Sequence, residues 1–83
     1  MLSEAEIKRL RWRSRRGMLE LDLLLLPFFD EVFPELTGSQ QHTFVKLLDQ
    51  DDPDLWSWFS RNSEPEDDDL VDMVEMILDR VQP

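Results

Sequence analysis

The chain has 83 residues, 9 basic and 19 acidic side chains, and a formal net charge of -10. A chain of this length buries about 60–65% of its unfolded surface, which is enough for one core but not for a deep cleft between lobes. With no cysteine, one histidine and two glycines, the sequence excludes disulfides, thiolate and multi-histidine metal sites, cysteine nucleophiles and glycine-rich phosphate loops. We therefore expect a single domain over residues 1–83.

Charge divides the chain into two unequal parts. Residues 1–16 hold six basic and two acidic residues, whereas residues 17–83 hold three basic and seventeen acidic ones. The acidic part would repel nucleic acid, so no nucleic-acid partner is predicted. The longest apolar run, residues 23–29, is far shorter than the roughly 20 residues of a membrane-spanning helix. Acids among the first residues also argue against a transit peptide, and we expect a cytoplasmic protein without membrane insertion.

The first predicted helix begins at Ser3, which can cap it, and Glu6 completes a capping box. Ile7 and Leu10 form a short apolar stripe, which Ser14 continues weakly. A neighbouring face carries arginines three or four residues apart: Arg9, Arg13 and Arg16. A glycine at position 17 interrupts the chain after this helix.

Residues 18–36 are the most apolar part of the chain. Leucines or phenylalanines at positions 19, 23, 26, 29 and 33 follow a helical period. Because apolar residues surround this helix, we predict that it is the central helix of a bundle. Pro27 is expected to kink the helix or bend its path, and Pro34 is expected to end it.

Two further helices are predicted between residues 37 and 60. Thr37 is expected to cap the third helix with Gln40 in a second capping box, and one face of this helix carries Gln40, Phe44, Leu47 and Leu48. The acidic turn that follows predicts a fourth helix with Asp52 as its cap and Pro53 as its first residue. The inner face of this short helix is predicted to comprise Leu55, Trp58 and Phe59.

A polar connector over residues 62–68 leads to the fifth predicted helix. Apolar residues recur there with the spacing of an amphipathic helix at Leu70, Val74, Ile77, Leu78 and Val81. The predicted fold class is therefore all-α, a small single-domain bundle of about five helices joined by short turns.

Most candidate chemical sites have a simpler structural interpretation. A calcium loop starting at Asp49 would need glycine sixth and glutamate twelfth, where the chain has Asp54 and Ser60. The acidic run at residues 64–69 suits a solvated helix start, with nonspecific magnesium binding as the alternative. His42 has no readable catalytic partner and is expected at the surface or its boundary. Among the tryptophans, Trp58 is expected in the core, whereas the other two are expected to be exposed.

The segment Arg16-Gly17-Met18-Leu19-Glu20 is the most suggestive local feature. In a helix, Arg16 and Glu20 would form an i, i+4 ion pair, and this plain ion pair is the favoured interpretation on spacing alone. Gly17 has two explanations that the sequence leaves open. It can allow another backbone to approach closely, or it can supply a positive φ between the first two helices.

This segment resembles the R-G-x-x-E signature of the SdhE/YgfY family, the bacterial assembly factors of the succinate dehydrogenase flavoprotein. Three later blocks resemble the family in order and spacing: residues 27–29, residues 44–48, and residues 51–55 with Trp58. The resemblance covers residues 9–81, which is nearly the whole chain. An ordered set of blocks is far more specific than the five-residue signature alone.

The resemblance implies a helical assembly chaperone, not an enzyme. The factor would bind the flavoprotein subunit of succinate dehydrogenase, with that of fumarate reductase as a further candidate, while the flavoprotein attaches FAD to its own histidine. Arg16, Gly17 and Glu20 are the implied contact residues, and the complete candidate partner-binding set is Arg9, Trp12, Arg13, Arg16, Gly17, Met18, Glu20 and Asp22. We expect no stably bound cofactor, no metal and a monomer. Two alternatives are a protein-binding antitoxin-like regulator, since the family also carries the label CptB, and a direct FAD-binding protein.

Overall fold

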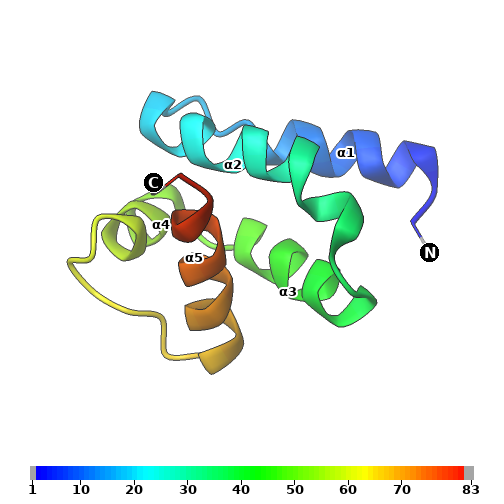
Figure 1. The fold of residues 1–83 in the computed structure, drawn as a ribbon. Coiled ribbons are helices and arrows are strands. Elements are labelled where there is room, and N and C mark those ends of the chain that lie inside the picture. Colours follow the sequence, from blue (N-terminus) through cyan, green and yellow to red (C-terminus); the bar gives the residue numbers. More distant parts are fainter. Residues whose placement is uncertain (1, 82–83) are drawn as a thin grey trace.

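The computed structural model describes residues 2–81, and its helices are joined by short connectors (Figure 1). The elements are α1 (Glu4–Ser14), α2 (Leu19–Glu31), the short 3-10 helix η1 (Phe33–Glu35), α3 (Gly38–Leu48), α4 (Asp52–Phe59) and α5 (Asp68–Val81). No strand occurs within the described residues. The predicted all-α bundle of five helices is confirmed.

Helix α2 is the centre of the bundle. It lies antiparallel beside α1 across the top of Figure 1, with α3 beneath this pair and with α4 and α5 on the opposite side from the N-terminus. Helix α2 contacts α1, α4 and α5, and α5 also packs on α3. The prediction that the second helix is central is therefore confirmed. None of the helices within residues 2–81 has the length and apolar character needed to span a bilayer.

Both predicted capping boxes are present. The Ser3 hydroxyl accepts a hydrogen bond from the Glu6 amide at 3.2 Å, and the Glu6 carboxylate accepts one from the Ser3 amide. Hydrogen bonding to the Glu6 carboxylate from Ser3, first from its backbone amide and then from its hydroxyl, holds the pKa of Glu6 below its usual value. Thr37 and Gln40 form the same reciprocal pair at the start of α3. Each box satisfies helix-start amides that have no partner within the helix.

The core is built around aromatic rings from α2, η1 and α3. Phe28 of α2 stacks on Phe44 of α3 with their ring centroids 5.7 Å apart. Phe29 stacks on Phe33 at 4.7 Å, and Phe33 meets Phe44 edge-on at 5.4 Å. All four rings are buried. Offset and edge-on ring pairs stabilise a core beyond the apolar area that they bury.

The face of α2 that enters this core differs from the predicted period. The buried residues are Leu21, Leu25, Phe28 and Phe29, whereas Leu19 and Leu23 are 66% and 62% exposed. The helix also ends at Glu31, so the prediction that Pro34 ends it is wrong, and Pro34 lies within η1. A helix that is apolar all round has no unique inner face, and the neighbouring helices select one by packing against it.

The start of α4 lies one residue earlier than predicted. Asp51 is the N-cap and makes no side-chain capping bond, while Asp52 and Pro53 are the first two helical residues. The prediction that Asp52 caps α4 is wrong because its carboxylate binds Arg16 instead. Leu55 and Phe59 are buried as predicted, and Trp58 packs half-buried against the core.

Helix α5 buries four of the five predicted apolar residues, Leu70, Val74, Ile77 and Leu78. Met73 is also buried on this face, whereas Val81 is exposed at the helix end. The preceding Asp67 accepts a hydrogen bond from the Asp69 amide and a second from Lys46 on α3, at 2.5 Å. Both bonds hold the pKa of Asp67 below its usual value.

Candidate protein-binding site

The connector between α1 and α2 carries the first part of the Arg16–Glu20 segment. Gly17 lies in this connector with a φ of +82° and is exposed. Side chains larger than hydrogen resist this backbone region, so the glycine is needed for the turn itself. A Cβ atom placed on Gly17 would meet nothing within 4 Å. The conformational explanation of Gly17 therefore has direct support, and the space around it is open.

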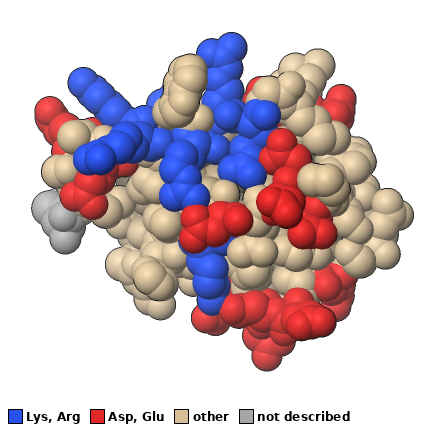
Figure 2. Space-filling model, turned by 180° about the vertical axis from the view of Figure 1, so that it is seen from behind, with Lys and Arg blue, Asp and Glu red and all other residues tan. Residues whose placement is uncertain are grey.

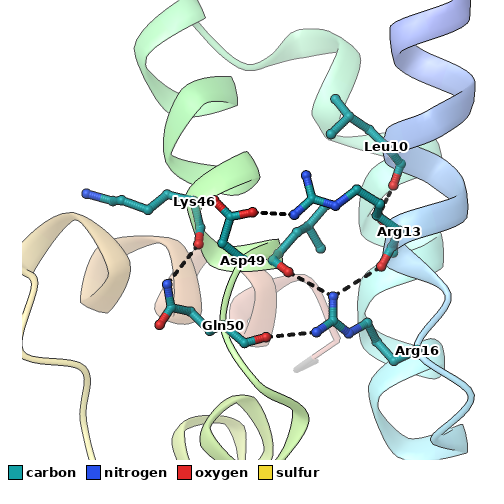
Figure 3. A network of polar contacts seen from close by, with 8 residues as sticks. Leu10, Arg13, Arg16, Lys46, Asp49 and Gln50 are labelled. Carbon is teal, nitrogen blue, oxygen red and sulfur yellow. Dashed lines mark hydrogen bonds and ion pairs between the residues drawn. The ribbon is translucent and has the colours of Figure 1, made fainter.

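The guanidinium group of Arg16 binds the segment that joins α3 to α4 (Figure 3). Its Nη1 donates to the Leu48 carbonyl at 2.9 Å and its Nη2 to the Gln50 carbonyl at 2.8 Å. Its Nε donates to the Asp52 carboxylate at 2.7 Å. The side chain is 15% exposed. Arg16 thus joins the end of α3 and the start of α4 to the α1–α2 connector.

This arrangement replaces the predicted ion pair between Arg16 and Glu20, which is wrong. Arg16 precedes α2 and is not helical, so the i, i+4 geometry of a helix does not apply to it. Asp22, in the first turns of α2, instead accepts a hydrogen bond from the Arg16 amide at 2.7 Å. Arg16 is therefore fixed through both its backbone and its side chain.

The first turn of α2 also carries side chains that take no part in these contacts. Glu20 is exposed and makes no hydrogen bond or ion pair with any residue between 2 and 81. The exposed Leu19 and Leu23 lie one helical turn apart beside it. Met18, the N-cap of α2, is half-buried against the core. This turn presents one free carboxylate next to two exposed leucines.

The basic residues of α1 divide into paired and free groups. Arg11 binds the Asp30 carboxylate at 2.8 Å and lowers the pKa of that carboxyl, and Arg13 binds Asp49. Arg16 pairs with Asp52, and the other three cations of residues 2–16 are exposed: Lys8, Arg9 and Arg15. They are close in sequence to Trp12, which is 72% exposed. Figure 2 shows basic atoms gathered over the upper part of the molecule, where α1 runs, and acidic atoms mainly along the right and lower edges.

The predicted partner-binding residues therefore fall into two groups. One lies on the α1–α2 connector and the first turns of α2: Arg16, Gly17, Met18, Glu20 and Asp22. The other lies on α1: Arg9, Trp12 and Arg13. Trp56 is exposed, as predicted, although less than Trp12. Sequence reasoning did not find the roles of Asp49 and Asp52, whose only signal was their place in an acidic turn.

Two acidic residues of this turn pair with arginines. Asp49 pairs with Arg13 and Asp52 with Arg16. In the part of the chain that the structure describes, no group of three or more histidine or acidic side chains is arranged to hold a metal ion. The candidate site therefore contains ion pairs, one free carboxylate and an exposed basic surface.

Comparison with known proteins agrees with this architecture. The family model described as "Flavinator of succinate dehydrogenase" matches residues 8–81. A protein of Pseudomonas aeruginosa, named FAD assembly factor SdhE, is 59% identical over 83 residues, covering 100% of this chain and 99% of the relative. The chain belongs to the SdhE family.

Other relatives with the same name extend the similarity beyond one species. The SdhE of Pseudomonas putida is 51% identical over 83 residues, covering 100% of this chain and 99% of its own length. The SdhE of Aliivibrio fischeri is 46% identical over 79 residues, covering 95% of this chain and 92% of its own length. The chain therefore matches SdhE proteins over nearly their full lengths.

Proposed function

We propose that this chain binds the flavoprotein subunit of succinate dehydrogenase and promotes the covalent attachment of FAD to it. The observation that carries the proposal is the family match over residues 8–81, together with 59% identity to a full-length FAD assembly factor. In this proposal the chain is not a catalyst and holds no cofactor stably, because FAD is attached to the partner. The flavoprotein of fumarate reductase is proposed as a second partner.

The geometry of the connector supports a docking role. The Arg16 guanidinium binds three carbonyls and Asp52, so the backbone that leads into α2 is held in place. A rigid surface loses less conformational entropy on binding than a mobile one. The groups left free for a partner are Glu20, the exposed leucines beside it, and the basic residues around Trp12.

A chaperone of this kind would act by selecting a conformation of its partner. A protein that binds one conformer of the flavoprotein more tightly than the others raises the population of that conformer. If that conformer holds FAD close to the acceptor histidine, attachment becomes faster without any reacting group from the chaperone. We propose that the chain acts in this way as a monomer in the bacterial cytoplasm.

The test is complementation in a bacterial strain that lacks its own assembly factor. Covalently bound flavin is measured by in-gel fluorescence of the succinate dehydrogenase flavoprotein after denaturation. The wild-type chain is expected to restore the fluorescent band, and Glu20→Ala is expected to restore much less of it. Glu35→Ala, which removes an exposed acid from η1, is the matched control.

Two results would contradict the proposal. One is a flavoprotein that remains unlabelled although the wild-type chain is present and folded. The other is a purified chain that is yellow and retains FAD by itself, which would support direct FAD binding instead. Capture of a different protein, with no flavoprotein bound, would support the antitoxin-like alternative.

A further inference from the structure

A groove of about 560 Å³ opens between α1 and the first half of α3. Its apolar lining comes from Leu2, Leu10 and Val45, while Arg9 and Arg13 line it from α1. Arg13 also pairs with Asp49 just beyond α3, as Figure 3 shows.

The charge of this groove favours an acidic occupant. Its lining carries two arginines and one acid, Glu6, which stays ionised in the capping box with Ser3. Arg13 pairs with Asp49, which lies outside the lining, whereas Arg9 is exposed and makes only a long 3.4 Å contact with a carbonyl of its own helix. The lining therefore has one net positive formal charge next to apolar surface.

We propose that this groove binds a short segment of the flavoprotein that combines an apolar side chain with a carboxylate. The apolar side chain would cover Leu10 and Val45, and the carboxylate would meet Arg9. The proposal rests on the proposed function and extends the predicted partner-binding surface, because Arg9 and Arg13 belong to both. Burial of the apolar side chain would add affinity, and the pairing of the carboxylate with Arg9 would orient the bound segment.

Gly38 offers a clean way to block the groove. It is the first residue of α3, it lines the groove, and a Cβ atom placed on it would meet nothing within 4 Å. Gly38→Trp should therefore fill the groove without disturbing the fold. Ser39→Trp, one position along the same helix on an exposed residue outside the groove lining, is the matched control.

The experiment measures binding of each variant to the purified flavoprotein subunit of succinate dehydrogenase before FAD attachment. Gly38→Trp is expected to weaken binding by about tenfold or more, and Ser39→Trp by less than about twofold. Charge is tested at the same position. Gly38→Glu is expected to bind less tightly than Gly38→Lys, with a difference that shrinks as salt is raised. A glutamate stabilises the first turn of a helix better than a lysine does, so a stability effect would give the opposite order.

The outcomes separate the groove from the proposed function. Binding by the wild-type chain tests the function, and the difference between Gly38→Trp and Ser39→Trp tests the groove. Equal binding by wild type and Gly38→Trp would overturn the groove proposal and leave the function standing. Sedimentation that shows loss of self-association in Gly38→Trp, with flavoprotein binding unchanged, would assign the groove to a second copy of the chain and overturn it too.

Discussion

The two ends of the Arg16–Glu20 segment have opposite environments. Arg16 is 15% exposed and binds Leu48, Gln50 and Asp52 across the molecule. Glu20 is exposed on the first turn of α2 and has no partner among residues 2–81. A five-residue signature can therefore contain one residue that is bonded within the fold and another whose side chain is free on the surface.

Gly17 connects these two environments. Its φ of +82° reverses the path of the chain between α1 and α2. The guanidinium of Arg16 can thereby reach the α3–α4 junction while Glu20 begins a helix on the outside. We therefore propose that Arg16 and Gly17 stabilise the fold and that Glu20 contacts the partner.

The largest loss of stability is expected when Arg16, the buried end of the segment, is replaced. Arg16→Gln removes the guanidinium that binds three carbonyls and a carboxylate. A hydrogen bond to a charged group contributes about 1.5–3 kcal/mol, and the shorter glutamine side chain keeps part of the contacts. We expect a loss of about 2–3 kcal/mol of unfolding free energy, or about 10–20 °C in Tm, in a domain of this size. Thermal and urea melts would measure it.

Arg11→Gln is the control for this prediction. Arg11 also pairs with an aspartate, but its side chain is 53% exposed. An exposed ion pair contributes about 0–1 kcal/mol, so Arg11→Gln should melt close to wild type. Equal losses in the two variants would show that the Arg16 contacts are no more stabilising than a surface pair.

The second largest effect is expected at the turn. Gly17→Ala places a Cβ atom on a residue with positive φ, so we expect a loss of about 1 kcal/mol or more. Gly38→Ala is the matched control because Gly38 lies in a helix and has equally open space around it. Its stability should be unchanged or higher. Chemical denaturation of both variants would measure the contrast, and equal stabilities would show that the turn tolerates a side chain.

The next effect is smaller and depends on pH. The guanidinium of Arg11 holds the pKa of Asp30 below its usual value, so the folded state favours the ionised carboxylate. This contribution is present above the usual aspartate pKa of about 3.9 and is lost as pH falls through the lower folded pKa. Asp30→Asn should therefore be slightly less stable than wild type at pH 7, by up to about 1 kcal/mol.

Urea melts of wild type and Asp30→Asn from pH 7 to pH 2.5 would test this prediction. The difference between the two proteins should disappear toward the acid end of the series. A difference that stays constant at every pH would show that the pair contributes through packing and not through charge.

The elements that the sequence predicts well are those with local causes. Ser3 with Glu6 and Thr37 with Gln40 lie three residues apart, so each capping box can be recognised from spacing alone. The inner face of α5 follows from its alternation of apolar and acidic residues. Residues 2–81 thus form the predicted bundle of five helices.

The features that the sequence does not predict depend on distant parts of the chain. Helix α2 is apolar on every side, and the selection of Leu21 and Leu25 over Leu19 and Leu23 comes from packing against its neighbours. Arg16 and Asp52 are separated by 36 residues. The i, i+4 spacing predicts that Arg16 pairs with a nearer acid, Glu20. Because the chain turns at Gly17, the Arg16 side chain binds Asp52 instead.

The same limit applies to the candidate site. The family resemblance identifies Arg16, Gly17 and Glu20 together, but it does not separate their roles. Their burial and hydrogen bonds favour a structural role for Arg16, because a guanidinium that is satisfied within the chain has few donors left for a partner. The groove beside Arg9 combines residues from α1 and α3 and leaves no local pattern in the sequence.

The most direct test of this account measures stability and flavoprotein binding in Glu20→Ala. Removal of an exposed and unpaired side chain should change the unfolding free energy by less than about 0.5 kcal/mol. Affinity for the purified flavoprotein subunit should fall by about tenfold or more, as expected for an interface charge that loses its partner. A variant that binds as tightly as wild type, or one whose binding and stability fall in proportion, would contradict the assignment of Glu20 to recognition.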